Sequence, residues 1–130
     1  MFELQISDIQ SAPTIAWTWA NKTISLVNSN VLFPHDFGNG HEIFAFDDLS
    51  SEKEESNRPG MSHAPKMNDI KGVLEFTNAF TDEDKVLIHC HAGLGRSPSV
   101  AVLALIQHGE TIDDAVKKVV DLRPSACFNK

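Results

Sequence analysis

A cysteine that ends an apolar run is the residue of this chain best placed to do chemistry. The stretch His89–Ser97 reads His-Cys-His-Ala-Gly-Leu-Gly-Arg-Ser, and the residues after it have a helix-like pattern. A strand, a tight glycine loop and a helix in that order place Cys90 at a helix N-terminus, under backbone N–H groups. Such surroundings lower a thiol pKa from near 8.5 to roughly 3.5–7.5, so we expect a thiolate at neutral pH. Arg96 adds a planar fork that can hold two phosphoryl oxygens, and the stretch predicts an anion site with a nucleophile at its floor.

Other interpretations of this stretch account for fewer of its residues. A lone cysteine after an apolar run is usually an inert core residue, but an inert core cysteine leaves the glycines and Arg96 unexplained. A nucleotide-binding loop needs Gly, four residues, and then Gly-Lys-Ser/Thr, which the sequence does not supply. A zinc site formed by His89, Cys90 and His91 is disfavoured because neighbouring strand residues point in different directions and no second ligand pair follows.

Strand-like and helix-like segments alternate along the chain. Strand patterns occur at residues 2–6, 23–27, 43–46 and 86–89, and helical spacing occurs at 11–21, 66–80, 97–107 and from Thr111 to about Leu122. This order predicts an α/β fold with a central, mostly parallel sheet of about four to five strands flanked by helices. Two long loops are expected, at 34–41 and 49–65. The second is a candidate substrate rim or lid, and a solvated connector is the alternative.

Composition limits the class of protein. The 130 residues suit one domain spanning 1–130, and the net charge of −7 argues against nucleic acid or an anionic membrane as the main partner. We expect a cytoplasmic protein, because no signal-like start or membrane-spanning run occurs and two distant cysteines do not form a disulfide scaffold. The oligomeric state is left open.

The cysteine stretch resembles the signature of the cysteine-dependent protein tyrosine phosphatase superfamily, His-Cys-x-x-Gly-x-x-Arg-Ser/Thr. All five positions are matched, at His89, Cys90, Gly93, Arg96 and Ser97. The resemblance covers about residues 20–130 and is greatest to the dual-specificity branch. The tyrosine-specific branch has a longer domain and a Trp-Pro-Asp loop, whereas this chain has Phe-Asp-Asp at 46–48.

The resemblance implies a role for each matched residue. Cys90 attacks phosphorus and forms a cysteinyl phosphate, Arg96 clamps the equatorial oxygens, and Ser97 eases departure of the sulfur. His89 supports the loop. His91 is either a charge at the pocket mouth or merely exposed. Backbone N–H groups that hold the phosphate come from the loop residues His91, Ala92, Gly93, Leu94, Gly95 and Arg96.

A general acid must protonate the leaving oxygen, and two aspartates are the candidates. Asp47 and Asp48 follow the predicted strand at 43–46. The family pattern favours the second, Asp48. Two solvated turn aspartates are the alternative. Cys127 is expected to be an inert thiol, and a protective disulfide with Cys90 is the alternative.

The predicted function is a phosphomonoester hydrolase, of protein-tyrosine or dual-specificity type, that needs no cofactor and no metal. Its substrate is a phosphorylated protein or a small phosphoester. Phosphoinositide enzymes of the superfamily usually have loop lysines where this chain has His91 and Leu94, and its acidity disfavours RNA. An inactive phosphoprotein-binding module and a rhodanese-like sulfur carrier are the alternatives outside the phosphatases.

Overall fold

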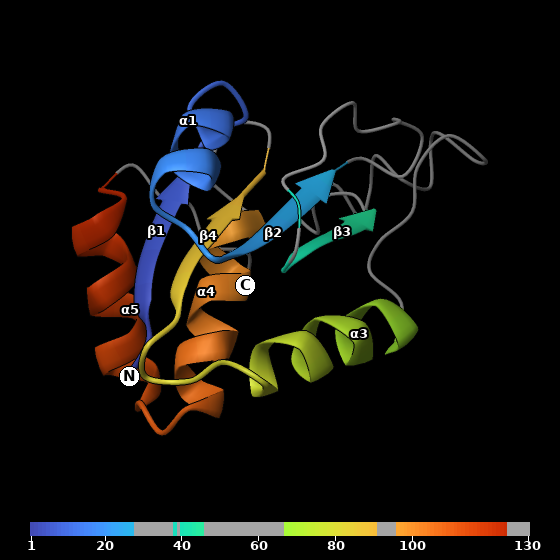
Figure 1. The fold of residues 1–130 in the computed structure, drawn as a ribbon. Coiled ribbons are helices and arrows are strands. Elements are labelled where there is room, and N and C mark those ends of the chain that lie inside the picture. The colour runs from blue at the N-terminus through green and yellow to red at the C-terminus, as the bar shows by residue number, and fades with distance from the viewer. Residues whose placement is uncertain (28–37, 39, 46–66, 91–95, 125–130) are drawn as a thin grey trace, which may run out of the picture.

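The computed structural model describes residues 1–27, 38, 40–45, 67–90 and 96–124 of the chain (Figure 1). The elements in chain order are β1 (Glu3–Ser7), α1 (Ala12–Thr18), β2 (Lys22–Val27), β3 (His41–Ala45), α3 (Met67–Asn78), β4 (Lys85–His89), α4 (Arg96–Gln107) and α5 (Ile112–Leu122). Within these described ranges, no helix is long and apolar enough to cross a membrane.

The four strands form one parallel sheet in the order β1-β4-β2-β3. The α/β fold with a parallel sheet predicted from the sequence is confirmed. Strand β4, the last of the described strands in chain order, lies between β1 and β2 and is almost wholly buried. Because parallel strands point the same way, the residues that follow all four strands gather at one edge of the sheet.

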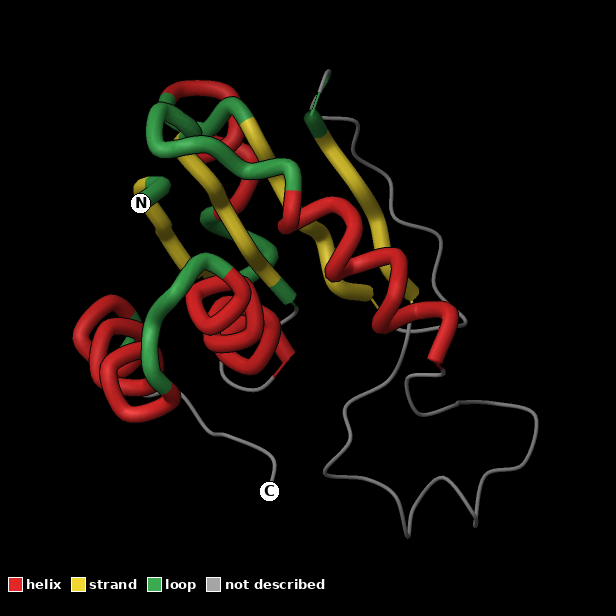
Figure 2. The backbone as a smooth tube through the Cα atoms, turned by 90° about the horizontal axis from the view of Figure 1, so that it is seen from below, coloured by secondary structure: helices red, strands yellow, loops and turns green. Residues whose placement is uncertain are grey.

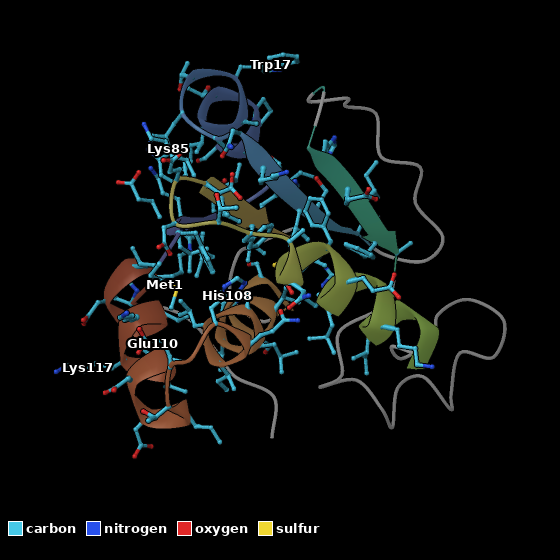
Figure 3. The ribbon with its side chains drawn as sticks, turned by 60° about the horizontal axis from the view of Figure 1, so that its bottom comes forward. Met1, Trp17, Lys85, His108, Glu110 and Lys117 are labelled. Atoms are coloured by element: carbon cyan, nitrogen blue, oxygen red, sulfur yellow. The ribbon has the colours of Figure 1, made fainter. Side chains whose placement is uncertain are left out.

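Helices cover both faces of the sheet (Figure 2). Ile24, Val86 and Ile88 point to one face, where they join a core with residues of α3, α4 and α5. Leu87 points to the other face and packs against Ala12 and Ala16 of α1. The small alanines let α1 approach the sheet closely. Trp17, on the same helix, is 65% exposed (Figure 3).

Strand β3 begins two residues earlier than the sequence pattern predicted. His41 had been assigned to the preceding loop, but its backbone pairs with β2 opposite Thr23. The pairing is set up by Gly40, whose carbonyl accepts a 2.9 Å hydrogen bond from the Thr23 N–H. Gly40 has φ +79°, and a Cβ there would lie 2.4 Å from the Asn21 carbonyl oxygen, so only glycine fits without a backbone shift.

The last helix starts as the sequence predicted. Thr111 is the N-cap of α5, and its side-chain oxygen accepts a 3.1 Å bond from the Asp114 N–H. Gly109 has φ +107°, a conformation that glycine adopts readily, in the turn that separates α4 from α5. The two helices pack against each other, and α4 also packs against β1 and β4.

Asp84 joins two segments at the edge of the sheet opposite to the cysteine. Its carboxylate accepts 2.8 Å bonds from the Thr81 N–H and from the Asn21 amide, and Asn21 in turn accepts from the Lys85 N–H. Burial alone raises the pKa of Asp84, but these hydrogen bonds and nearby Lys22 outweigh it and lower the pKa below 3.8. We expect Asp84→Asn to lower the free energy of unfolding at pH 7 by about 2 kcal/mol, measured by urea denaturation.

The same substitution should change how stability depends on pH. Because folding lowers the pKa of Asp84, its contribution is present above the ordinary value of 3.8 and is lost as pH falls through the folded-state pKa. Asp84→Asn should therefore flatten the acid limb of the stability curve. Glu83→Gln, in the same turn but exposed, is the matched control and should leave stability within about 0.5 kcal/mol. An equal loss in both variants would show that the Asp84 hydrogen bonds contribute little.

Candidate functional site

Cys90 lies immediately after β4, at the C-terminal edge of the parallel sheet. Its side chain is 3% exposed and belongs to the core formed by the sheet and α4. β4 runs between two other strands, so the position of Cys90 is fixed by pairing on both sides. A thiol on a rigid strand end is well held for reaction with a group bound at that edge.

The first turn of α4 packs directly on the cysteine. The Ser97 hydroxyl is fully buried, and its Oγ lies 3.2 Å from Cys90 Sγ, within hydrogen-bonding distance of a sulfur. Arg96 is the first residue of α4 and is only 9% exposed. The N-terminus of a helix carries a partial positive charge, so the start of α4 favours negative charge on the sulfur and on a bound anion.

His89, the last residue of β4, connects Cys90 to side chains on β2 and β3. His89 Nε2 lies 2.6 Å from Ser25 Oγ on β2, and Ser25 Oγ lies 2.7 Å from His41 Nε2 on β3. His89 Nδ1 lies 3.4 Å from the Cys90 carbonyl oxygen. Sequence reasoning found His89 but missed Ser25 and His41. The signal was a serine in the middle of an otherwise apolar strand, since such a buried hydroxyl needs partners.

Several predicted site residues lie outside the described residues. They are Asp47, Asp48, His91, Ala92, Gly93, Leu94, Gly95 and Cys127. The strand that precedes Asp47 and Asp48 in the sequence, β3, is described. β3 ends at Ala45, at the same edge as Cys90 and two strands away, which is a separation of about 10 Å at ordinary strand spacing.

Asp8 is the described carboxylate that follows a strand at this edge. Its Oδ1 accepts a 2.8 Å bond from the Ser11 N–H, and its Oδ2 lies 4.0 Å from Arg123 Nη2. The hydrogen bonds from Ser11, and secondarily Arg123, hold the pKa of Asp8 below 3.8. A carboxylate that is ionised at neutral pH and bonded to the start of α1 is poorly suited to donate a proton to a leaving group. Among the described residues, no three His, Cys, Asp or Glu side chains are grouped so as to hold a metal ion.

Two solved phosphatases have the same fold as this chain. The PTP-2 phosphatase of Cydia pomonella superposes with a TM-score of 0.65 at 16% identity, covering 98% of this chain and 80% of that one. Human DUSP28 superposes with a TM-score of 0.64 at 18% identity, covering 97% of this chain and 82% of that one. At these identities the similarity establishes the fold. The resemblance to protein tyrosine and dual-specificity phosphatases is confirmed at that level.

A curated relative shares sequence over a shorter stretch. Bovine protein tyrosine phosphatase type IVA 3 is 40% identical over 55 residues, which are 41% of this chain and 32% of the relative. The match thus spans about a third of the relative's length. No family model matches the chain.

Proposed function

We propose that this chain is a cysteine-dependent phosphomonoester hydrolase of the protein-tyrosine or dual-specificity type. The observation that carries the proposal is the contact between Cys90 Sγ and the Ser97 hydroxyl, 3.2 Å apart, at the junction of β4 and α4. This contact brings a thiol to the start of a helix at the sheet edge where α/β folds bind their ligands. The shared fold of two solved phosphatases and the bovine relative support the same conclusion.

In the first step, the Cys90 thiolate attacks phosphorus in line with the ester oxygen. A sulfur–phosphorus bond forms as the phosphorus–oxygen ester bond breaks, and the leaving oxygen takes a proton from Asp48. Arg96 and the N–H groups of residues 91–96 stabilise the charge on the equatorial oxygens. The burial of Arg96 at the first position of α4 supports this role, because a desolvated guanidinium interacts more strongly with an anion.

In the second step, water attacks phosphorus and the sulfur–phosphorus bond breaks. The electron pair returns to Cys90 as a thiolate, the Asp48 carboxylate accepts the water proton, and inorganic phosphate leaves. Ser97 stabilises the departing thiolate by donating a hydrogen bond from its hydroxyl to the sulfur. The 3.2 Å contact supports this role, since charge develops on the sulfur at this point.

The proposed substrate is a phosphorylated protein or a small phosphoester rather than a nucleic acid. The net charge of −7 supports this choice, because a polyanion would be repelled by the surface as a whole. The bovine relative is named as a protein tyrosine phosphatase, which supports a phosphorylated tyrosine side chain as the first substrate to test.

The choice of general acid is tested by comparing two leaving groups. Asp48→Ala should slow kcat about 10²-fold on an alkyl phosphate, whose leaving oxygen needs a proton, and far less on p-nitrophenyl phosphate. The basic limb of the pH–rate profile should also disappear, because it reports loss of the acid's proton. Steady-state kinetics on the two substrates measures both effects.

Asp47→Ala is the matched control for this prediction, since it removes the same group from the adjacent position. It should leave kcat on both substrates nearly unchanged. If Asp47→Ala is the damaging variant and Asp48→Ala is mild, the general acid is Asp47.

A further inference from the structure

One hydroxyl bridges two imidazoles in the sheet beside the cysteine. Ser25 Oγ lies 2.6 Å from His89 Nε2 and 2.7 Å from His41 Nε2, so the contacts cross β3, β2 and β4 in that order. Ser25 and His89 are fully buried, whereas His41 is partly exposed at the start of its strand. A partly exposed residue is thus connected through buried polar groups to the residue that precedes the nucleophile.

The partners determine which atom donates in each hydrogen bond. The Cys90 carbonyl can only accept, so its 3.4 Å contact requires a proton on His89 Nδ1. In neutral His89 the Nε2 atom then accepts, and the Ser25 hydroxyl donates to it. The only hydroxyl proton of Ser25 is used in this way, so Ser25 Oγ accepts from a proton on His41 Nε2. The bonds therefore run in one direction, from His41 through Ser25 and His89 to Cys90.

Among the described residues, few charged groups surround the hydrogen bonds that run from His41 to Cys90. Helix α1, which covers this face of the sheet, has the sequence APTIAWT and no charged side chain. Strand alternation places Glu3 and Lys85 on this face at the far end of β1 and β4, and it places Glu42 on the opposite face. Asp8 follows β1 and is bonded to Ser11. The imidazoles are thus the titratable pair along the middle of this face.

We infer that His41 and Ser25 are positioning residues for Cys90 that act through His89, an inference that rests on the proposed role of Cys90 as nucleophile. Donors aligned in one direction strengthen each other, and their positive ends point toward the cysteine residue. They hold the Cys90 main chain where the phosphate loop begins, and they favour negative charge on its sulfur. Loss of the His41 donor should therefore raise the pKa of the Cys90 thiol.

The test is the pH dependence of Cys90 alkylation by iodoacetamide in the full chain, followed by mass spectrometry of the Cys90 peptide. His41→Leu should move the midpoint upward by about half a pH unit, a roughly threefold smaller thiolate fraction below the midpoint. His41→Gln should restore the original midpoint, because its amide nitrogen can donate from nearly the same place as His41 Nε2. A merely structural role for His41 would not produce this difference between the two variants.

His108→Leu is the matched control. His108 directly follows α4, at the opposite end of this helix from Cys90 (Figure 3), and its Nε2 lies 2.7 Å from the Thr77 carbonyl oxygen. It should leave the midpoint unchanged. An unchanged midpoint in His41→Leu, or an equal shift in His41→Gln, would overturn the inference. If His41→Leu does not fold, Ser25→Ala breaks the same connection and should raise the midpoint by a similar amount.

Alkylation reports on the sulfur whether or not the chain hydrolyses phosphate. A chain that shows the predicted shifts but no phosphatase activity would contradict the proposed function and leave the connection from His41 to Cys90 intact. A chain that is active but shows no shift would contradict the inference alone. The two proposals can therefore fail independently.

Discussion

Replacement of Cys90 by serine should abolish hydrolysis of an aryl phosphate. The variant keeps a polar atom at the end of β4, but a serine hydroxyl is not ionised at neutral pH and cannot form the cysteinyl phosphate. We expect kcat to fall by at least about 10³-fold, measured with p-nitrophenyl phosphate. In the wild-type chain Cys90 Sγ lies 3.2 Å from Ser97 Oγ. A serine hydroxyl at position 90 can also form a hydrogen bond with Ser97, so the fold should survive.

The Cys90→Ser variant should still bind phosphate although it no longer hydrolyses the substrate. Calorimetric titration with inorganic phosphate should give a dissociation constant close to that of the unchanged chain, because Arg96 and the start of α4 are intact. Cys127→Ser is the matched control and should keep full activity. Full activity in Cys90→Ser would refute the nucleophilic mechanism. Phosphate binding without any turnover in the unchanged chain would instead indicate a binding module.

The sequence predicted the fold because short-range patterns and long-range packing agree in this chain. The apolar run at 86–88 predicted a buried strand, and β4 is buried because it lies between two other strands. The helical pattern from Thr111 predicted the start of α5, and Thr111 caps this helix through local chemistry that needs no tertiary context. The order of the strands in the sheet could not be predicted, since it depends on which hydrophobic faces meet.

The parts of the site that the sequence could not predict are contacts between distant strands. His41 and Ser25 are 16 positions apart, and Ser25 and His89 are 64 apart, so no spacing rule connects them. The pattern at 43–46 also hid the true start of β3, because His41 pairs through its backbone and its side chain is polar.

Arg96→Lys should separate charge from geometry at the phosphate site. Lysine keeps the positive charge, but it cannot offer two parallel N–H groups to two equatorial oxygens. Arg96 is only 9% exposed at the first position of α4, so its guanidinium is held on the rigid end of a helix that also carries Ser97. We expect kcat/KM for p-nitrophenyl phosphate to fall about 10³-fold, mostly in kcat, because the clamp is strongest on transition-state charge.

Arg123→Lys provides the matched comparison, since it makes the same change at the end of α5, where Arg123 Nη2 lies 4.0 Å from Asp8. It should leave kcat/KM unchanged, as a partly exposed ion pair contributes little. If Arg96→Lys lost only a few-fold in kcat/KM, charge alone would suffice and the bidentate clamp would be wrong. A fall in both variants would point to loss of folding, which circular dichroism would reveal. Only a large loss confined to Arg96→Lys fits a guanidinium that grips the phosphoryl group as it is transferred to Cys90.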